Sequence, residues 1–282
     1  MSRVAVVGAG TMGNGIAHVF AQHGWETALI DVSDDALARG LATIRKNLER
    51  MEKKGAISHQ QSADTLGRIT TSTSLEAAKD AELVVEAVSE NPEIKFEVFA
   101  ALRRLTPPDT ILASNTSSIS ITELAKHTDR PEKVIGMHFM NPVPVMNLVE
   151  VIRGLETSSN TVARTEEIVR ELEKTPVVVN DAPGFVTNRV LMPMINEAIL
   201  CVQEGIATAE AVDQVMTLGM KHPLGPLALA DLIGLDVCLA ILNVMVEGFA
   251  DPKYRPARLL KEMVASGRLG RKSGVGFYVY RD

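Results

Sequence analysis

A histidine and a glutamate twelve positions apart are the residues of this sequence best suited to proton transfer. His138 lies at the end of one predicted strand, and Glu150 lies inside the next. The intervening Asn141-Pro142-Val143-Pro144 cannot continue a helix and predicts a stiff connection that brings the two strands together. The carboxylate would then hold one imidazole nitrogen while the other handles a substrate proton. The alternative is a core histidine beside a carboxylate on a solvated strand face.

A glycine-rich segment near the start of the chain indicates a dinucleotide site. Arg3–Val7 predicts a strand, and Gly8-Ala9-Gly10-Thr11-Met12-Gly13 follows it directly, leading into a helix from Met12 to His23. Strand, G-x-G-x-x-G turn and helix together place a pyrophosphate at a helix N-terminus. In this arrangement Gly8 allows the tight turn, Gly10 lets the backbone approach the pyrophosphate, and Gly13 lets helix and strand pack closely.

An acidic residue after the second predicted strand, Glu26–Ile30, points to the cofactor. Asp31 would accept hydrogen bonds from the ribose hydroxyls and repel a 2′-phosphate. The next positive residue, Arg39, lies well beyond this position, whereas Ser33 could still contact such a phosphate. The sequence therefore favours NAD over NADP.

Length and charge exclude several classes of function. A chain of 282 residues accommodates one nucleotide-binding domain and a smaller second domain. The net charge of −6 argues against nucleic acid as a partner. Cys201 and Cys238 lie in apolar helical stretches and make no metal-binding pattern, so we expect reduced thiols, no metal and a cytoplasmic location. We expect no signal peptide and no membrane span, because the chain enters a predicted strand at once and has no long apolar run.

The elements that must position these residues alternate between strand and helix up to about residue 180. Further strands are predicted at Arg68–Thr71, Leu83–Val88, Thr110–Ala113, Val134–His138, Asn147–Ile152 and Val177–Asn180, and helices at Asp34–Lys54, Pro92–Leu105 and Thr161–Lys174. This alternation predicts an α/β fold with a Rossmann-like, doubly wound, mostly parallel sheet. From Pro183 onward the apolar spacing is helical throughout. We therefore expect an NAD-binding domain at 1–182 and a smaller all-α domain for substrate binding and dimerisation at 183–282.

Several motifs, in a fixed order along the whole chain, resemble the short-chain L-3-hydroxyacyl-CoA dehydrogenases, most closely the bacterial 3-hydroxybutyryl-CoA dehydrogenases. Besides GAGTMG near the start and GRKSGVGFYVY near the end, they are SNTSS at Ser114–Ser118, HFMNPVPVMNLVEV at His138–Val151, PGFVTNR at Pro183–Arg189 and HPLGPLALADLIGLD at His222–Asp236. The resemblance implies an NAD-dependent enzyme that interconverts 3-hydroxybutyryl-CoA and acetoacetyl-CoA.

The same resemblance implies a role for each site residue. His138 would be the general base and Glu150 its orienting partner, while Ser117 and Asn188 would bind the substrate oxygens and Asn141 would help to hold the site together. The cofactor-binding set would comprise Gly8, Gly10, Thr11, Met12, Gly13, Asp31, Glu90, Lys95 and Asn115.

Three of these assignments have structural alternatives. Ser117 could belong to a serine-rich helix cap, and Asn188 could be an ordinary polar contact early in a helix. Glu90 and Lys95 could form a salt bridge at a helix start.

A basic stretch suggests where an acyl-CoA substrate would bind. In Arg45–Lys54 positive residues outnumber the acidic ones, and the resulting charge could hold the phosphates of CoA, with Arg50 and Lys54 as the expected contacts. A solvated helix face is the alternative. The apolar segment Leu224–Ala250 would form either a domain core or a subunit interface, and the family resemblance implies a homodimer through the C-terminal domain.

Two other functions remain open from the sequence. A sugar-acid dehydrogenase of the L-gulonate type would keep Ser117, His138, Glu150 and Asn188 without needing a basic CoA site. A non-catalytic NAD-binding protein of the crystallin type would not need the four catalytic residues. The β-hydroxyacid dehydrogenases with a catalytic lysine are disfavoured, because Gly184–Ala198 contains no lysine.

Overall fold

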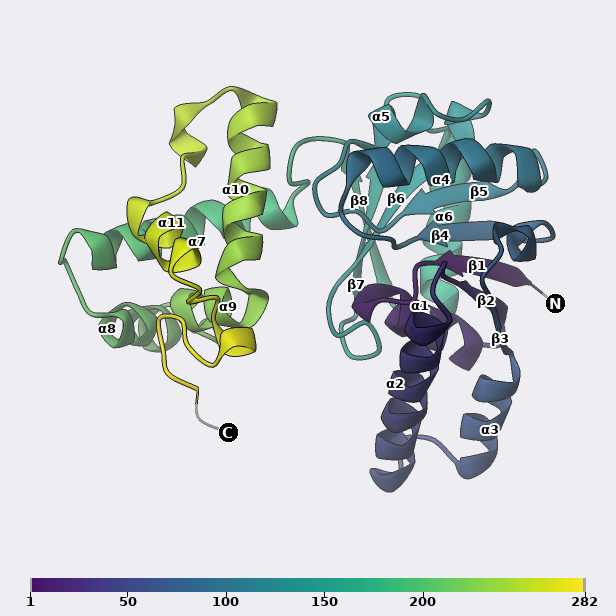
Figure 1. Ribbon diagram of the computed structural model, residues 1–282, viewed down its shortest axis with the longest axis horizontal. Coiled ribbons are helices and arrows are strands. Elements are labelled where there is room, and N and C mark those ends of the chain that lie inside the picture. Colours follow the sequence, from purple (N-terminus) through teal and green to yellow (C-terminus); the bar gives the residue numbers. More distant parts are fainter. Residues whose placement is uncertain (1, 281–282) are drawn as a thin grey trace. The chain divides into compact units, whose positions relative to one another are not determined.

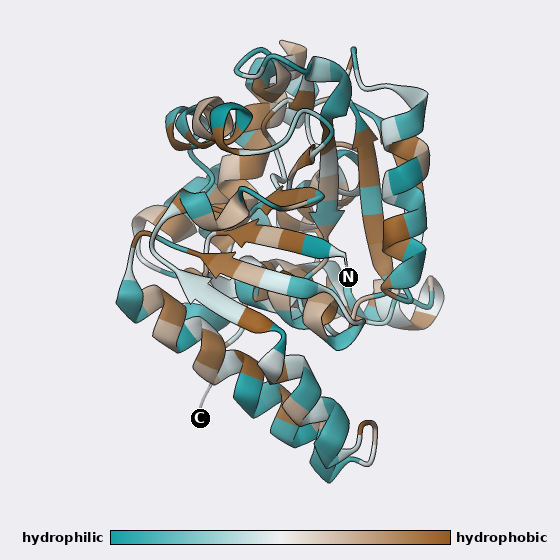
Figure 2. Ribbon diagram, turned by 90° about the vertical axis from the view of Figure 1, so that its right-hand side faces the viewer, coloured by the Kyte–Doolittle hydropathy of each residue, from teal (hydrophilic) through white to brown (hydrophobic). Residues whose placement is uncertain are grey.

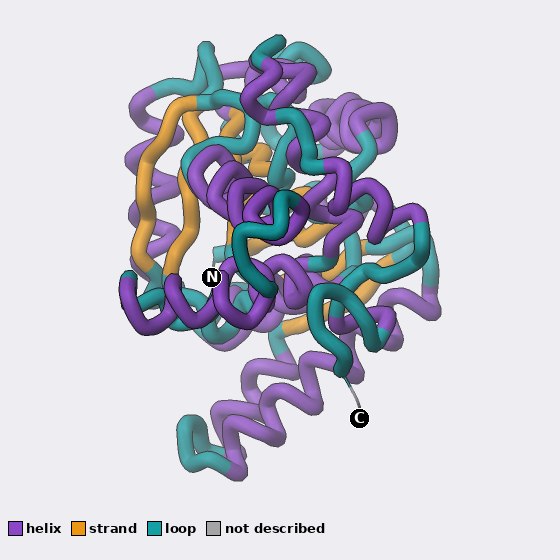
Figure 3. The backbone as a smooth tube through the Cα atoms, turned by 90° about the vertical axis from the view of Figure 1, so that its left-hand side faces the viewer, coloured by secondary structure: helices purple, strands orange, loops and turns teal. Residues whose placement is uncertain are grey.

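Two compact units make up the chain and divide between Asp181 and Ala182. The computed structural model describes residues 2–280 (Figure 1). The first unit is built around a β-sheet, whereas the described part of the second, residues 182–280, consists of helices and loops. Figure 3 shows the strands in orange and the helices in purple.

The sheet of the first unit has eight strands in the order β3-β2-β1-β4-β5-β6-β7-β8. The strands are β1 (Arg3–Val7), β2 (Glu26–Ile30), β3 (Ile69–Ser72), β4 (Leu83–Glu86), β5 (Ile111–Ser114), β6 (Val134–Phe139), β7 (Leu148–Arg153) and β8 (Thr175–Asn180). All neighbouring pairs are parallel except β6 and β7, which are antiparallel. The strand order reverses next to β1, as in doubly wound sheets that bind dinucleotides. The predicted fold class is confirmed.

Helices accompany this sheet. They are α1 (Thr11–Gln22), α2 (Asp34–Lys53), α3 (His59–Gly67), α4 (Pro92–Leu105), α5 (Ile121–Ala125) and α6 (Ser159–Glu171), with 3₁₀ turns η1 (Leu75–Ala78) and η2 (Pro131–Lys133). The α2–α3 hairpin extends away from the sheet, and in Figure 2 apolar and polar residues alternate along it. Such alternation suits helices that bury one face and leave the other in water.

Local hydrogen bonds and residue types explain where helices and strands begin and end, and why some of these ends differ from the predicted ones. A capping box begins α3: the hydroxyl of Ser58 accepts from the amide of Gln61, and the Gln61 side chain accepts from the amide of Ser58. Strand β4 ends at Glu86 instead of Val88, because the Glu86 carboxylate accepts a hydrogen bond from the Val88 amide. Strand β8 begins at Thr175, ahead of a proline that an edge strand tolerates.

The second unit is a helical assembly with its own core. It contains α7 (Thr187–Gln203), α8 (Ala209–Gln214), a π-helical turn η3 (Val215–Gly219), α9 (Pro226–Ile233), α10 (Leu235–Phe249), η4 (Pro252–Tyr254), α11 (Arg258–Ala265) and η5 (Arg271–Ser273). Within the segment 224–250, Leu227, Leu242 and Met245 are buried in this core, while Leu232 and Val237 are exposed. The segment thus forms core on one side and open surface on the other.

None of the helices in residues 2–280 is by itself long and apolar enough to cross a membrane. Helices α9 and α10 reach the required length and composition only as a pair, which is bent by 96°.

A buried histidine on α1 makes the first unit sensitive to acid. His18 is completely buried, and this burial lowers the pKa of its imidazole to about 4 from the ordinary 6.5. Between these two pH values the unfolded chain binds more protons than the folded chain, so the free energy of unfolding falls as the pH drops below 6.5.

We therefore expect His18→Gln to reduce the acid sensitivity of the fold. From the two pKa values of His18, its titration should lower the free energy of unfolding of the wild-type protein by about 2 kcal/mol between about pH 7.5 and about pH 5. Urea denaturation of both proteins at the two pH values measures this difference. Parallel losses of stability in wild type and variant would show that His18 does not titrate as its burial predicts.

Candidate active site

The antiparallel pairing of β6 with β7 sets His138 directly opposite Glu150. Side chains at opposed positions lie on the same face of the sheet and within contact distance. The Nδ1 atom of His138 lies 2.8 Å from Oε2 of Glu150, and its Nε2 atom lies 3.1 Å from the hydroxyl of Ser117. His138 and Glu150 are only 7% and 2% exposed. With Nδ1–H donating to the carboxylate, the lone pair of Nε2 faces the Ser117 hydroxyl.

Ser117 belongs to the loop that follows β5, and Glu90 organises this loop. One carboxylate oxygen of Glu90 accepts hydrogen bonds from the Thr116 hydroxyl (2.6 Å), the Ser117 amide (2.9 Å), and the amide (3.1 Å) and hydroxyl (2.9 Å) of Ser118. Burial of the Glu90 carboxyl opposes ionisation, but the charge of Lys95 and these hydrogen bonds together lower its pKa. The anionic form of Glu90 therefore fixes the backbone that carries Ser117.

The capping alternative for Ser117 is wrong. Helix α5 is capped by Ser120, whose hydroxyl accepts from the amide of Glu123 at 3.2 Å. Ser117 lies three residues before this cap and contacts His138 instead. Its position in the loop therefore directs the hydroxyl toward the imidazole of His138.

A buried ion pair that the sequence analysis missed supports the same region. The ammonium of Lys95 lies 2.6 Å from Glu86 and 3.4 Å from Glu90, so its closer partner is the residue that ends β4. Glu86 also accepts a hydrogen bond from Ser114 at 2.6 Å, and burial raises the pKa of the Glu86 carboxyl. Glu86 thus joins β4, β5 and α4 through a single side chain. The signal in the sequence was an acidic residue at the end of an otherwise apolar strand.

The glycine-rich turn forms a cradle of the size and chemistry that a dinucleotide needs. A Cβ atom on Gly13 would lie 1.7 Å from the Gly8 carbonyl oxygen, and Gly8 has a φ of +105° with a built Cβ 2.5 Å from the Ala87 oxygen. Only glycine fits at either position. A Cβ on Gly10, by contrast, would meet open space. The backbone between Gly10 and the start of α1 is therefore accessible to a phosphate at a helix N-terminus.

A cavity of about 620 Å³ lies against this turn, entirely within the first unit. Its lining includes Gly10, Thr11, Met12 and Asp31, together with apolar residues of β1, β2 and α4 and of the segment that follows β4. The oxygens of Asp31 accept hydrogen bonds from the amides of Ala9 (2.8 Å) and Ser33 (3.0 Å), which fix the carboxylate in the cavity wall. Arg39 lines a different, smaller cavity beside the turn. The site therefore presents a negative charge where a 2′-phosphate would lie.

The remaining residues predicted for the site lie on several different elements of the two units. Asn115 is buried, and its side-chain oxygen accepts from the amide of Phe139, while Asn141 is exposed in the β6–β7 connection. Asn188 is the second residue of α7 in the C-terminal unit and is buried there. Arg50 and Lys54 are exposed at the end of α2, and neither pairs with an acidic side chain among residues 2–280. In the same part of the chain, no cluster of three or more His, Cys, Asp or Glu residues is arranged to hold a metal ion.

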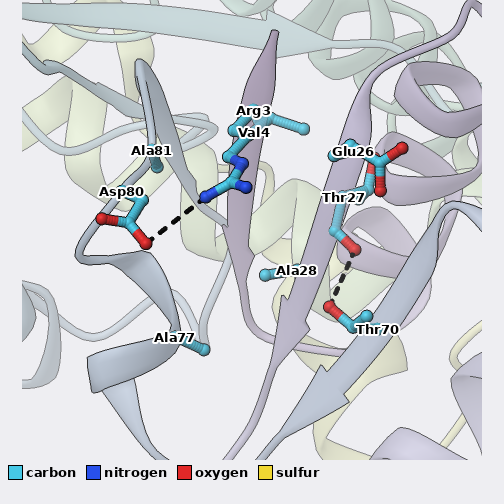
Figure 4. Close-up of a pocket in the computed structure, with 9 residues that line it drawn as sticks. All are labelled: Arg3, Val4, Glu26, Thr27, Ala28, Thr70, Ala77, Asp80 and Ala81. Atoms are coloured by element: carbon cyan, nitrogen blue, oxygen red, sulfur yellow. Dashed lines mark hydrogen bonds and ion pairs between the residues drawn. The ribbon is translucent and has the colours of Figure 1, made fainter. Parts of the chain in front are cut away.

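A further cavity, of about 410 Å³, lies at the amino ends of the strands (Figure 4). It is lined by Arg3 and Glu26, the first residues of β1 and β2, and by Asp80, which pairs with Arg3 at 3.3 Å. Doubly wound sheets bind their ligands at the carboxyl ends of the strands, and this cavity lies at the amino ends. We therefore place the active site at the edge that carries Asp31, Ser117 and His138.

Comparison with known proteins agrees with this geometry. Residues 3–182 match the model of the 3-hydroxyacyl-CoA dehydrogenase NAD binding domain, and residues 184–280 match that of the 3-hydroxyacyl-CoA dehydrogenase C-terminal domain. The chain is 53% identical to a probable 3-hydroxybutyryl-CoA dehydrogenase of Bacillus subtilis, covering 100% of this chain and 98% of the relative. It is 50% identical to a 3-hydroxybutyryl-CoA dehydrogenase of Bradyrhizobium diazoefficiens, covering 100% and 96%.

A solved structure gives the same result. The (S)-3-hydroxybutyryl-CoA dehydrogenase of Ralstonia eutropha superposes with a TM-score of 0.97 at 50% identity, over 100% of both chains. These matches extend over the whole chain and do not favour the sugar-acid or crystallin alternatives. The chain belongs to the 3-hydroxyacyl-CoA dehydrogenase family and is an NAD-dependent oxidoreductase acting on a CH–OH group.

Proposed function

We propose that this protein interconverts (S)-3-hydroxybutyryl-CoA and acetoacetyl-CoA with NAD as cofactor. The observation that carries the proposal is the Glu150–His138–Ser117 chain of contacts, which presents an imidazole nitrogen and a hydroxyl together. The full-length relatives named 3-hydroxybutyryl-CoA dehydrogenases supply the substrate class. A longer or functionalised acyl chain would use the same residues.

The proton transfer follows from the two nitrogens of His138. In oxidation, the C3 hydroxyl proton passes to Nε2 of His138 as the C3–H bond breaks with its electron pair and the C3 carbonyl forms. Bound NAD⁺ supplies the acceptor for that hydride. Glu150, at Nδ1, keeps Nε2 directed at the substrate and stabilises the imidazolium that results. Ser117 donates a hydrogen bond to the substrate oxygen, and in reduction His138 returns the proton.

Separate groups would hold the cofactor and the substrate. Gly8, Gly10 and Gly13, with the amides of Thr11 and Met12, receive the pyrophosphate, and Asp31 receives the adenosine ribose. Glu90, Lys95 and Asn115 maintain the nicotinamide end of the site through the loop that carries Ser117. Arg50 and Lys54 bind the CoA phosphates, and Asn141 and Asn188 complete the substrate contacts.

We also propose how the chain is divided and assembled. Residues 1–182 act as the NAD-binding domain, and residues 183–282 bind substrate and form a homodimer. Exposed apolar side chains of the second unit, including Val190, Ile206, Leu218 and Met220, support such a contact. A cytoplasmic enzyme without nucleic-acid or membrane partners accords with the net charge of −6 and with the free thiols of Cys201 and Cys238.

The test of the function is NADH oxidation with acetoacetyl-CoA, repeated with NADPH. We expect turnover with NADH and a kcat/KM at least about 10-fold lower with NADPH, because Asp31 repels the 2′-phosphate. Faster turnover with NADPH would contradict the role of Asp31 but not the reaction. No turnover with either cofactor, at any pH at which the protein is folded, would contradict the proposed function.

His138→Gln should remove the general base without disturbing the cofactor site. The expected loss in kcat is about 100- to 10,000-fold, because positioned acid–base groups contribute this much. NADH affinity, measured by fluorescence titration, should be unchanged, since His138 does not line the cavity beside the glycine-rich turn. His127→Gln is the matched control, because the ring of His127 stacks on Phe96 and forms none of the contacts between His138, Glu150 and Ser117. A loss of less than about tenfold for His138→Gln would remove it from the mechanism.

Charge reversal at Arg50 and Lys54 should affect only the CoA substrate. We expect Arg50→Glu/Lys54→Glu to raise the KM for acetoacetyl-CoA about 10-fold or more and to leave the KM for NADH unchanged. The rise should shrink at high salt, because these side chains are exposed. Lys126→Glu, also exposed, serves as the charge control. Equal KM values in wild type and double variant would place the CoA phosphates elsewhere.

A further inference from the structure

The connection between β6 and β7 is held by a buried lysine from another part of the chain. Lys174 lies between α6 and β8, and its ammonium donates hydrogen bonds to the carbonyl oxygens of Val143 and Met146, each at 2.7 Å. Both carbonyls belong to residues 140–147, which we call the β6–β7 loop. This loop joins the strand of His138 to the strand of Glu150.

These two hydrogen bonds stabilise the positive charge of the Lys174 ammonium, which would otherwise be costly to bury. Lys174 is 7% exposed, and burial lowers the pKa of its ammonium. Within residues 2–280 no carboxylate forms an ion pair with it. A buried cation without a counter-ion is tolerated when charge-assisted hydrogen bonds satisfy it, and the loop carbonyls provide these bonds. Any shift of the β6–β7 loop therefore leaves the ammonium unsatisfied.

The β6–β7 loop also packs against α1. Val143 is 1% exposed, and a Cβ atom built on Gly15 would lie 2.9 Å from the Val143 Cβ. The loop thus has no room to move toward α1, the helix that begins at the glycine-rich turn. The two hydrogen bonds from Lys174 restrain the loop as well. At the end of the loop, the amide of Thr175 donates to the carbonyl of Asn147 at 2.7 Å, which joins the start of β8 to the same connection.

We propose that Lys174 is a positioning residue for proton transfer: its ammonium fixes the β6–β7 loop so that β6 and β7 keep the His138 imidazole against the Glu150 carboxylate. The proposal rests on the proposed dehydrogenase function. Lys174 acts through the backbone, since its two bonds go to carbonyls and not to the imidazole or the carboxylate. The pair of this ladder nearest the loop is Phe139 with Val149, so this one pair separates the held loop from His138 and Glu150.

The test is steady-state kinetics of Lys174→Met with acetoacetyl-CoA and NADH. Methionine retains the apolar stem of lysine as far as Cε but cannot donate to the carbonyls. We expect kcat to fall about 10-fold or more, because small misplacements of catalytic groups cost rate steeply. The KM for acetoacetyl-CoA and the dissociation constant for NADH should stay within about twofold of wild type, because Lys174 does not line the cavity at the glycine-rich turn. Lys126→Met, at an exposed position, is the matched control.

Lys174→Arg gives the rescue arm, because a guanidinium can still donate to both carbonyls. Its kcat should exceed that of Lys174→Met by at least about threefold. If Lys174→Met fails to fold, Lys174→Leu, which also lacks a donor, takes its place in the comparison with arginine. A folded Met or Leu variant with wild-type kcat would overturn the inference, as would a parallel loss of kcat and NADH affinity. An inactive wild-type protein would overturn the proposed function and the inference together.

Discussion

The antiparallel pairing of β6 with β7 is the constraint on which the active site depends. Every other neighbouring pair in the sheet is parallel, and parallel neighbours require a long crossover between them. The single reversal lets a short connection place two consecutive strands side by side. It sets His138 and Glu150 at opposed positions, with the imidazole 2.8 Å from the carboxylate. A shift of one residue in this register would direct one side chain to the other face and separate the pair.

The rest of the site is built from charged side chains, most of them buried, that hold backbone segments. Glu90 fixes the loop that carries Ser117, Glu86 and Lys95 join β4, β5 and α4, and Lys174 holds the β6–β7 loop. Each of these groups is satisfied by short hydrogen bonds or by an opposite charge. A buried network of this kind specifies one arrangement, because displacing any member leaves an unpaired polar group. The imidazole that we propose as the general base therefore lies in a frame built from the protein's own hydrogen bonds and ion pairs.

Much of this frame follows from local sequence, and some of it does not. The glycine spacing, the alternation of strands and helices, and the capping box at Ser58 depend on residues close in the chain, and each is present in the structure. The same is true of the turn that unites β6 and β7. Glu86 and Lys174 escaped prediction because their partners lie on other elements, at contacts that only packing creates. The helix-cap interpretation of Ser117 failed for the same reason: its decisive partner is His138, on a different strand.

The most direct test of this account is Glu150→Gln, which keeps the size of the side chain and removes its charge. NADH oxidation with acetoacetyl-CoA should slow about 100-fold in kcat, because the neutral amide neither stabilises an imidazolium nor selects the required tautomer. The dissociation constant for NADH and the melting temperature should remain close to those of wild type. A kcat within about threefold of wild type would contradict the claim that the carboxylate opposite His138 drives proton transfer.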